Sequence, residues 1–138
     1  MITPHFGVSI SDTETQKKTN IRYTSKKNVI SKETSDVMKN VLETVVSEGG
    51  GKKAAIEGYK VGAKTGTSEK LPRRSGKYIA SCMGFAPAQN PKVIALVLID
   101  EPSGIYYGGT IAAPVISKLL DDILPYVDGK EDYGYSGN

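Results

Sequence analysis

Four consecutive residues have side chains whose types and spacing could do chemistry: Lys64, Thr65, Gly66 and Thr67. If the segment is a strand, its side chains alternate, so Thr65 and Thr67 share one face while Lys64 and Gly66 share the other. Two hydroxyls spaced in this way can both bond one carboxylate, and Lys64 adds a positive charge nearby. Gly66 lets an extended ligand lie against the backbone, and the Thr67 N–H can form half of an oxyanion hole. The alternative at this point is a solvated edge strand that bears a lysine.

The same segment is similar to the end of a phosphate-binding loop, GxxxxGK[ST]. Here Ala63 separates Gly62 from Lys64, and no Gly-Lys pair in the sequence is followed by Ser or Thr. The segment also leads into a basic loop, whereas a phosphate-binding loop leads into a helix. We therefore do not expect nucleotide binding.

An arm and an amphipathic helix are predicted ahead of this segment. Residues 4–30 alternate weakly around the polar run SDTETQKKTN, which favours a hairpin or a loop-rich arm. Apolar residues at i, i+1, i+4 and i+5 predict a helix over Lys32 to Glu48. Ser31 is the expected N-cap. Residues 49–51, all glycine, are expected to end the helix through left-handed dihedral angles.

Three strands and a second helix complete the prediction. The strands are Tyr59–Thr67, Tyr78–Phe85 and Lys92–Ile99. The short turn between the last two favours antiparallel pairing, and the apolar run VIALVLI indicates a strand covered on both faces. The helix is expected from Gly108 to Leu124, with Pro114 tolerated in its first turn and Pro125 ending it.

The fold class is therefore α+β, with three antiparallel strands packed against N- and C-terminal helices. Residues 1–125 are assigned to the C-terminal portion of a single domain. Residues 126–138 are polar and glycine-rich, and we expect them to be a disordered tail.

Composition excludes several classes of function. The 138 residues include 18 basic and 15 acidic side chains, and the net charge of +3 is too small to indicate nucleic-acid binding. No apolar run is long enough to span a membrane, and no export signal opens the chain. One His and one Cys cannot build a zinc site, so we expect neither a metal nor another cofactor.

Other residues that could suggest a site have simpler interpretations. Asp100 and Glu101 are adjacent, so on a strand they would point to opposite faces and could not easily serve one site. Cys82 is expected to be a buried, inert thiol. Arg73 and Arg74 are expected in a solvated loop.

Beyond the four residues, a longer series of motifs resembles the C-terminal part of the class B penicillin-binding proteins. The motifs are GYKVGAKTGT, then GKYIASCMGFAPAQNPKVIALVLIDEP, then YYGGTIAAPVISKLLDDIL. The similarity runs from about residue 4 through Leu124, and it is strongest to the sporulation and cell-division transpeptidases of Gram-positive bacteria. The order and spacing of these motifs are far more specific than KTGT alone.

This resemblance implies a fragment of the penicillin-binding-protein/β-lactamase-like transpeptidase fold. Members of the family have Ser-x-x-Lys, Ser-x-Asn and Lys-Thr-Gly motifs. They acylate the first serine with a peptidoglycan stem peptide outside the membrane and then cross-link it, and β-lactams trap the same serine. By resemblance, Lys64 belongs to the charge network around that serine, and Thr65 and Thr67 bind the substrate carboxylate. Gly66 leaves room for the ligand, and the Thr67 N–H is an oxyanion donor.

The sequence also departs from the family's pattern. No serine from Ser9 to Ser117 is followed by Lys three positions later or by Asn two positions later, and the one Ser-x-Asn, at residues 136–138, lies in the predicted tail after KTGT. Thr24 precedes Lys27 by three residues, but it lies in the polar arm. The resemblance therefore implies a segment that lacks the upstream half of its domain and is inactive alone. The alternative is a non-catalytic relic or interaction module that keeps the fold. A smaller departure is Ala63, where the family usually has Gly.

Strand Val93–Ile99 raises one further expectation. In the family's fold this strand has a neighbour from the upstream sequence, and an exposed apolar edge recruits another strand. No lysine, proline or glycine interrupts these seven residues. We therefore expect self-association through residues 93–99.

Overall fold

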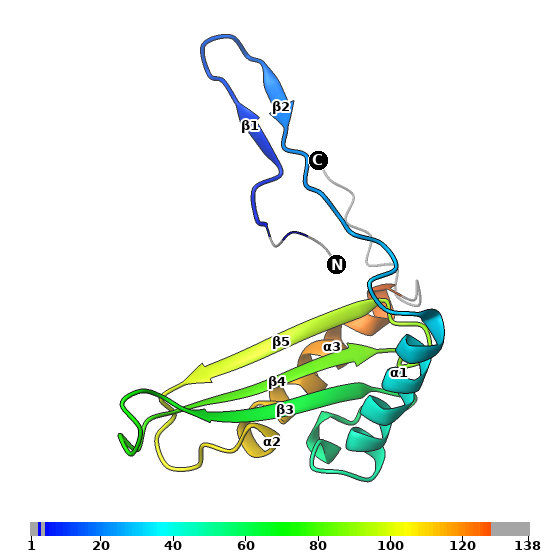
Figure 1. Cartoon of the computed structure of the whole chain (residues 1–138), viewed down its shortest axis with the longest axis vertical. Helices are drawn as coiled ribbons and strands as arrows, with labels where there is room; N and C mark the ends of the chain where they lie inside the picture. The colour runs from blue at the N-terminus through cyan, green and yellow to red at the C-terminus, as the bar shows by residue number, and fades with distance from the viewer. Residues whose placement is uncertain (1–2, 4, 128–138) are drawn as a thin grey trace. The chain divides into compact units, whose positions relative to one another are not determined.

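The computed structural model describes residue 3 and residues 5–127 (Figure 1). The chain divides into two compact units, residues 1–35 and residues 36–138, and each is considered by itself. The tail predicted for residues 126–138 lies outside the described residues from position 128 onward. Tyr126 and Val127 belong to the last helix, so the prediction fails for these two residues.

The first unit contains a β-hairpin, as the alternation in the arm favoured. Strands β1 (Ser9–Ser11) and β2 (Lys18–Asn20) pair antiparallel. The turn between them is held by Asp12, whose Oδ1 accepts hydrogen bonds from the N–H groups of Glu14 and Thr15 at 2.9 and 3.0 Å. These backbone donors stabilise the ionised carboxylate and lower the pKa of Asp12. The hairpin is therefore organised by its own polar residues.

Helix α1 (Lys32–Ser47) begins where the sequence predicts. Ser31 is its N-cap, because the Ser31 hydroxyl accepts the N–H of Thr34 at 3.1 Å. The predicted reason for its end is wrong, since none of the three glycines at 49–51 has a positive φ. A Cβ on Gly49 or Gly51 would lie 2.9 or 3.0 Å from the Val45 carbonyl oxygen. Gly49 and Gly51 are needed because the chain folds back tightly against the end of the helix. A short 3-10 turn, η1 (Lys52–Ala54), follows.

The three predicted strands form one antiparallel sheet in the order β3-β4-β5. Their bounds are Gly62–Glu69 for β3, Tyr78–Ala86 for β4 and Val93–Asp100 for β5. The register pairs Thr65 with Cys82 and Cys82 with Val97. Because cross-strand partners lie on the same face, this register defines the two faces of the sheet.

One face of the sheet packs against helix α3 (Ala113–Val127), which crosses behind β4 and β5 in Figure 1. Ile116, Leu120 and Leu124 of the helix are fully buried against it. The sheet supplies small side chains here, including Ala63, Ala80 and Cys82, and a Cβ at Gly84 would overlap Ile116. Small residues on the strands therefore let the helix approach the sheet closely.

The second helix begins at Gly108 as predicted, but it is interrupted and it ends later than predicted. It is divided into α2 (Gly108–Ile111) and α3, with Ala112 between them. Pro114 is the second residue of α3, and it has no N–H to continue the bonding from α2, which accounts for the break. Pro125 lies inside α3 and does not end it. None of the helices in the described residues is long and apolar enough to cross a membrane.

The prediction that both faces of β5 are covered is wrong for the described residues. Val93, Ala95, Val97 and Ile99 pack on the core. On the opposite face Ile94, Leu96 and Leu98 remain 67, 61 and 63% exposed. The apolar run therefore contains one buried face and one exposed apolar face. Val37, Met38 and Val41 of α1 are exposed as well, whereas Val46 near its end is buried.

The close contact at Gly84 gives a test of the packing. Gly84→Ala should lower the free energy of unfolding by about 1–3 kcal/mol, because the new methyl group overlaps Ile116 in a closely packed layer. Gly50→Ala is the matched control, since a Cβ there meets nothing within 4 Å. Its effect should stay within about 0.5 kcal/mol. Urea unfolding monitored by circular dichroism measures both, and equal effects would contradict the packing argument.

Candidate functional site

Strand β3 places the four residues of the candidate site at an edge of the sheet. Within the described residues β3 pairs only with β4, so its other side is open. Lys64 and Thr67 are exposed, and Thr65 and Gly66 are half-buried. The segment is therefore accessible to a ligand along the strand.

The ladder pattern decides which backbone groups face the open edge. The Lys70 N–H donates to the Lys77 carbonyl at 2.8 Å, in the register that continues the β3–β4 pairing. In an antiparallel pair, hydrogen-bonded and non-hydrogen-bonded positions alternate. Counting back from Lys70, the N–H and C=O groups of Thr65 and Thr67 point away from β4. These two residues thus direct backbone groups to the open edge, where the Thr65 carbonyl accepts a hydrogen bond from the Lys64 Nζ.

The side chains of Thr65 and Thr67 lie on the same face of the sheet as their partners Cys82 and Ala80. On this face the Thr67 Oγ1 accepts a hydrogen bond from the N–H of Gly108, the first residue of α2, at 3.1 Å. A hydroxyl has two lone pairs and one proton. Accepting from Gly108 therefore leaves the Thr67 O–H proton available for an anionic partner.

Glycine is required where α2 meets the strands. A Cβ on Gly108 would overlap the carbonyl oxygens of Gly66 and Ser81, and one on Gly109 would lie 2.7 Å from the Gly50 carbonyl oxygen. The start of α2 therefore lies directly on the backbones of β3 and β4. The sequence predicts only a helix start at Gly108 and Gly109, although two adjacent glycines are also a signal of close backbone approach.

Packing within the sheet is one reason why position 66 is glycine, apart from any role toward a ligand. A Cβ at this position would lie 2.7 Å from the Ser81 Oγ on β4. Any larger residue would thus require Ser81 to move. The requirement for glycine at position 66 does not by itself indicate a bound ligand.

Lys64 lies on the face opposite the two threonines and pairs across the sheet with Met83. Its Nζ donates a hydrogen bond to the carbonyl of Thr65. Cys82 is fully buried, as predicted, and burial raises the pKa of its thiol, an effect that the charge of Lys64 partly opposes. The thiol is therefore an inert core group.

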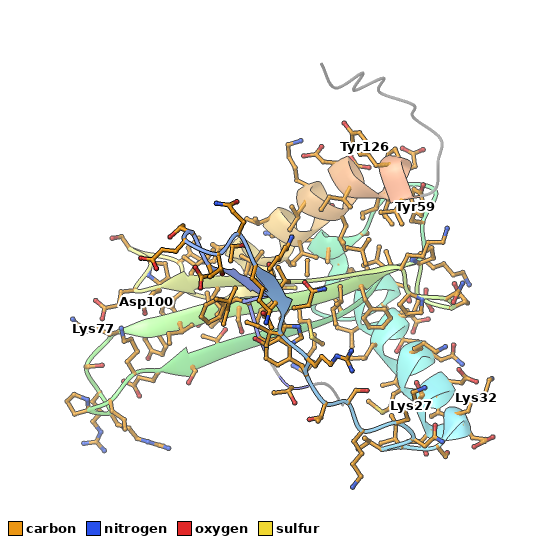
Figure 2. The ribbon with its side chains drawn as sticks, turned by 90° about the horizontal axis from the view of Figure 1, so that it is seen from above. Lys27, Lys32, Tyr59, Lys77, Asp100 and Tyr126 are labelled. Carbon is orange, nitrogen blue, oxygen red and sulfur yellow. The ribbon has the colours of Figure 1, made fainter. Side chains whose placement is uncertain are left out.

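The prediction that Asp100 and Glu101 point to opposite faces of the sheet is wrong. The Lys70 Nζ donates to Asp100 at 2.9 and 3.1 Å and to Glu101 at 2.8 Å. Glu101 lies beyond the end of β5 with a φ of 48°, so the alternation of the strand no longer applies. Lys77 also pairs with Glu101 at 3.1 Å, and Figure 2 shows Lys77 and Asp100 at the same end of the sheet.

Hydrogen bonds from Lys70 and then Lys77 lower the pKa of Glu101. Hydrogen bonds to Glu101 and then Asp100 raise the pKa of Lys70. Both carboxylates are engaged by lysines, which suits an ionic clamp at the base of the β3–β4 hairpin. This arrangement does not suit an acid–base pair, in which one carboxyl must be held protonated.

Aromatic rings that sequence analysis did not single out lie beside this end of the sheet. Tyr78 of β4 stacks on Tyr106 with ring centroids 4.0 Å apart and an interplanar angle of 7°. Tyr106 in turn contacts Tyr107, 4.7 Å away, and a hydrogen bond to Tyr106 raises the pKa of Tyr107. The stack fixes the segment that leads directly into Gly108 and α2. It therefore helps to position the partner of the Thr67 hydroxyl.

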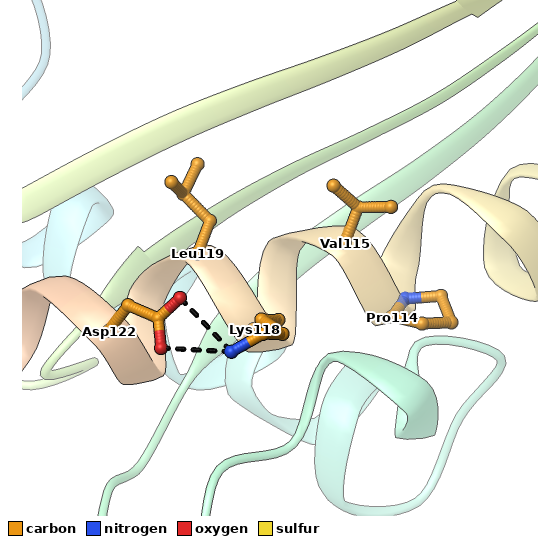
Figure 3. A pocket seen from close by; sticks show the side chains of 5 residues that line it. All are labelled: Pro114, Val115, Lys118, Leu119 and Asp122. Atoms are coloured by element: carbon orange, nitrogen blue, oxygen red, sulfur yellow. Dashed lines mark hydrogen bonds and ion pairs between the residues drawn. The ribbon is translucent and has the colours of Figure 1, made fainter.

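A hollow of about 400 Å³ lies elsewhere, along the outer side of α3 (Figure 3). It is lined by α3 residues alone, and its charged groups, Lys118 and Asp122, pair with each other at 3.1 and 3.2 Å. It contains no residue of the β3 motif. Among the described residues, no group of three or more His, Cys, Asp or Glu side chains could hold a metal ion.

This combination of fold and motif defines a class of protein. The chain belongs to the family of the penicillin binding protein transpeptidase domain, whose pattern matches residues 1–121. The resemblance drawn from the KTGT, GFAPA and YYGGT motifs is thereby confirmed.

Individual relatives are similar over most of this chain. Stage V sporulation protein D of Bacillus subtilis is 48% identical over 107 residues, which cover 73% of this chain and 16% of the relative. Peptidoglycan D,D-transpeptidase FtsI of Escherichia coli is 45% identical over 90 residues, which cover 62% of this chain and 15% of the relative. The chain thus spans about a sixth of the length of these relatives.

Solved structures match the fold. The transpeptidase domain of Burkholderia pseudomallei penicillin-binding protein 3 is 36% identical, with a TM-score of 0.65 over 86% of this chain and 35% of that one. The transpeptidase domain of FtsI4 from Legionella pneumophila is also 36% identical, with a TM-score of 0.62 over 69% of this chain and 37% of that one. The predicted α+β architecture with three antiparallel strands is confirmed.

The bond between Thr67 and Gly108 gives a second test. Thr67→Val should lower the free energy of unfolding by about 1 kcal/mol, because the partly buried N–H of Gly108 loses its acceptor. It should also speed amide hydrogen exchange at Gly108. Thr67→Ser keeps the oxygen and should restore both properties. Equal behaviour of the Val and Ser variants would show that the hydroxyl does not hold α2.

Proposed function

We propose that this chain is a C-terminal segment of a penicillin-binding D,D-transpeptidase domain and supplies its substrate-binding strand. The complete domain would cross-link peptidoglycan stem peptides through an acyl-serine intermediate. The observation that supports this most directly is the KTGT segment on an open strand edge, with both threonines on the face that meets α2.

Each residue has a role in this proposal. The Thr65 and Thr67 hydroxyls bind the terminal carboxylate of the stem peptide, and the Thr67 N–H is one oxyanion donor. The support for the second role is the ladder pattern, which directs that N–H toward the open edge. Gly66 lets the peptide lie flat against β3. Lys64 contributes positive charge to the network around the nucleophile.

The nucleophile itself comes from another part of the domain. The sequence contains no Ser-x-x-Lys, and its one Ser-x-Asn, at residues 136–138, follows KTGT in the tail, so the chain alone supplies no serine in the family's nucleophile motif. Its partners are therefore the upstream part of the domain and, in the complete site, a stem peptide or a β-lactam. We place the site of action at the extracytoplasmic face of the cell membrane. Self-association through residues 93–99 is a further proposal for this chain alone, because in the family's fold this strand is paired with a strand from the upstream sequence.

The second candidate function is a non-catalytic relic or interaction module that keeps the fold for packing. The observation that favours it is the absence of Ser-x-x-Lys, and of any Ser-x-Asn ahead of KTGT, from a chain whose sheet and helices are well formed. The two candidates differ in one property that can be measured. Only the first requires that the KTGT strand still supports acylation when a nucleophilic serine is supplied.

Covalent labelling separates the two candidates. The purified chain should form no adduct with a fluorescent penicillin, because it has no acylable serine in a family motif. A chimera in which this segment replaces the matching segment of Bacillus subtilis stage V sporulation protein D should be labelled, since 48% identity favours correct packing. Adducts are read on a denaturing gel. Labelling of the isolated chain would refute the proposal, and a folded but unlabelled chimera would favour the relic.

Within that chimera, Lys64→Ala should slow acylation about 10²–10³-fold, the scale of losing one preorganised donor. Lys53→Ala is the matched control, because Lys53 is also exposed but lies on η1 and not on the motif strand. Rates are measured by stopping the labelling reaction at intervals. A Lys64→Ala rate within about twofold of the control would remove this lysine from the proposed site.

A further inference from the structure

The loop between β3 and β4, residues 70–77, lies where the open edge of β3 ends. The edge is closed at its start, because Ala63 is fully buried, whereas none of the strand's residues from position 64 onward is buried. A peptide whose terminal carboxylate binds Thr65 and Thr67 therefore extends toward Glu69 and the loop. The loop begins three residues beyond Thr67, a span that an extended peptide covers in about 10 Å.

Two of the four cationic side chains in this loop have no anionic partner. Lys70 and Lys77 are engaged by the two carboxylates at the end of β5. Arg73 and Arg74 are exposed, as expected for a solvated loop, and among the described residues neither guanidinium pairs with a carboxylate. A guanidinium group binds a carboxylate through two parallel N–H bonds. The loop therefore offers two groups suited to an anionic ligand.

Hydrogen bonds within the loop fix the backbone that carries these arginines. The Glu69 Oε1 accepts the N–H of Arg74 at 2.6 Å, and the Ser75 Oγ donates to the Lys70 carbonyl at 3.3 Å. Arg74 has a φ of 68°, which is uncommon outside glycine and persists where the surrounding structure determines it. A site that is ordered before binding loses less entropy when its ligand binds. The loop is thus already arranged to present its two cations.

We propose that Arg73 and Arg74 form a second carboxylate-binding site, for an acidic residue in the body of the peptide whose terminal carboxylate binds Thr65 and Thr67. This inference rests on the proposed function, because the position of the peptide along β3 comes from it. The second site favours peptides of peptidoglycan that carry a carboxylate ahead of their terminal one. It selects among substrates by charge at a point away from the reacting bond.

The number and place of the unpaired cations favour an acidic peptide over a lipid surface. Anionic lipid surfaces are recognised by clusters of about four to eight Lys or Arg residues. Only Arg73 and Arg74 remain without a carboxylate in this loop, and the net charge of the chain is +3. The two arginines also continue directly from the strand that holds the proposed peptide. Continuity with that edge and a small local charge both suit a single acidic side chain.

Co-sedimentation of the full 138-residue chain with purified, insoluble peptidoglycan tests the site. The doubly substituted chain, Arg73→Gln with Arg74→Gln, should have a dissociation constant about three- to tenfold higher, the range for two exposed ion pairs. Leu71→Gln is the matched control, because Leu71 is 84% exposed in the same loop and carries no charge. It should bind like the unmodified chain. Circular dichroism verifies that each variant is folded.

Chemical amidation of the peptidoglycan carboxyl groups identifies the group that the arginines bind. On the amidated polymer the doubly substituted chain and the Leu71→Gln control should bind equally, because no carboxylate remains for the arginines to pair with. An arginine effect that persists on the amidated polymer, or that is absent on the untreated one, would overturn the proposal. Tighter arginine-dependent binding to phosphatidylglycerol vesicles than to untreated peptidoglycan would assign the loop to a lipid surface and would also overturn it.

These results separate the second site from the proposed function. A chimera that is labelled by penicillin, together with arginine variants that bind peptidoglycan unchanged, would overturn the second site alone. An unlabelled chimera, together with carboxylate-dependent binding through Arg73 and Arg74, would support the site for acidic peptides and count only against the transpeptidase proposal.

Discussion

The close approach of the start of α2 to the backbones of β3 and β4 is the contact on which the site depends. It exists because Gly108 has no side chain, and any Cβ there would overlap the carbonyl oxygens of Gly66 and Ser81. The approach brings the Gly108 N to 3.1 Å from the Thr67 Oγ1. One lone pair of that oxygen therefore accepts the Gly108 hydrogen bond. The ring stack of Tyr78 and Tyr106 holds the segment before it, and α3 continues from it into the core.

Within the described residues, the sheet has two unpaired edges that differ in chemistry. At β3 the exposed groups are polar, and the outward backbone groups belong to two threonines, which suits a small extended ligand with a negative charge. At β5 the exposed groups are aliphatic, and the outward backbone groups belong to Ile94, Leu96 and Leu98, which suits another strand. One ladder pattern produces both edges, because antiparallel pairing directs alternate residues outward. The chemistry of each edge then follows from which residues occupy those positions.

The ionic groups of the molecule support structure more than chemistry. Lys70 binds Asp100 and Glu101 together and thereby ties the base of the β3–β4 hairpin to the end of β5. Lys118 and Asp122 neutralise each other on the outer side of α3. Lys64 is different. Within the described residues its Nζ donates a hydrogen bond to the neighbouring carbonyl of Thr65 and pairs with no carboxylate. It is the cation that suits the proposed site best.

Much of this organisation follows from the sequence alone. Apolar periodicity identified α1 and the three strands, a short turn indicated antiparallel pairing, and the spacing of KTGT, GFAPA and YYGGT identified the family. These features are local, so local patterns suffice to predict them.

Other features required tertiary structure. Gly49 and Gly51 lie close to a carbonyl of α1, Gly66 lies close to Ser81, and Gly108 lies on two strands, and no local pattern specifies these contacts. Helix α3 continues through Pro125 despite the local rule, and Asp100 and Glu101 meet one lysine only because the chain turns after β5. Sequence determined which elements form, and close packing between distant segments decided how the residues of the site are held.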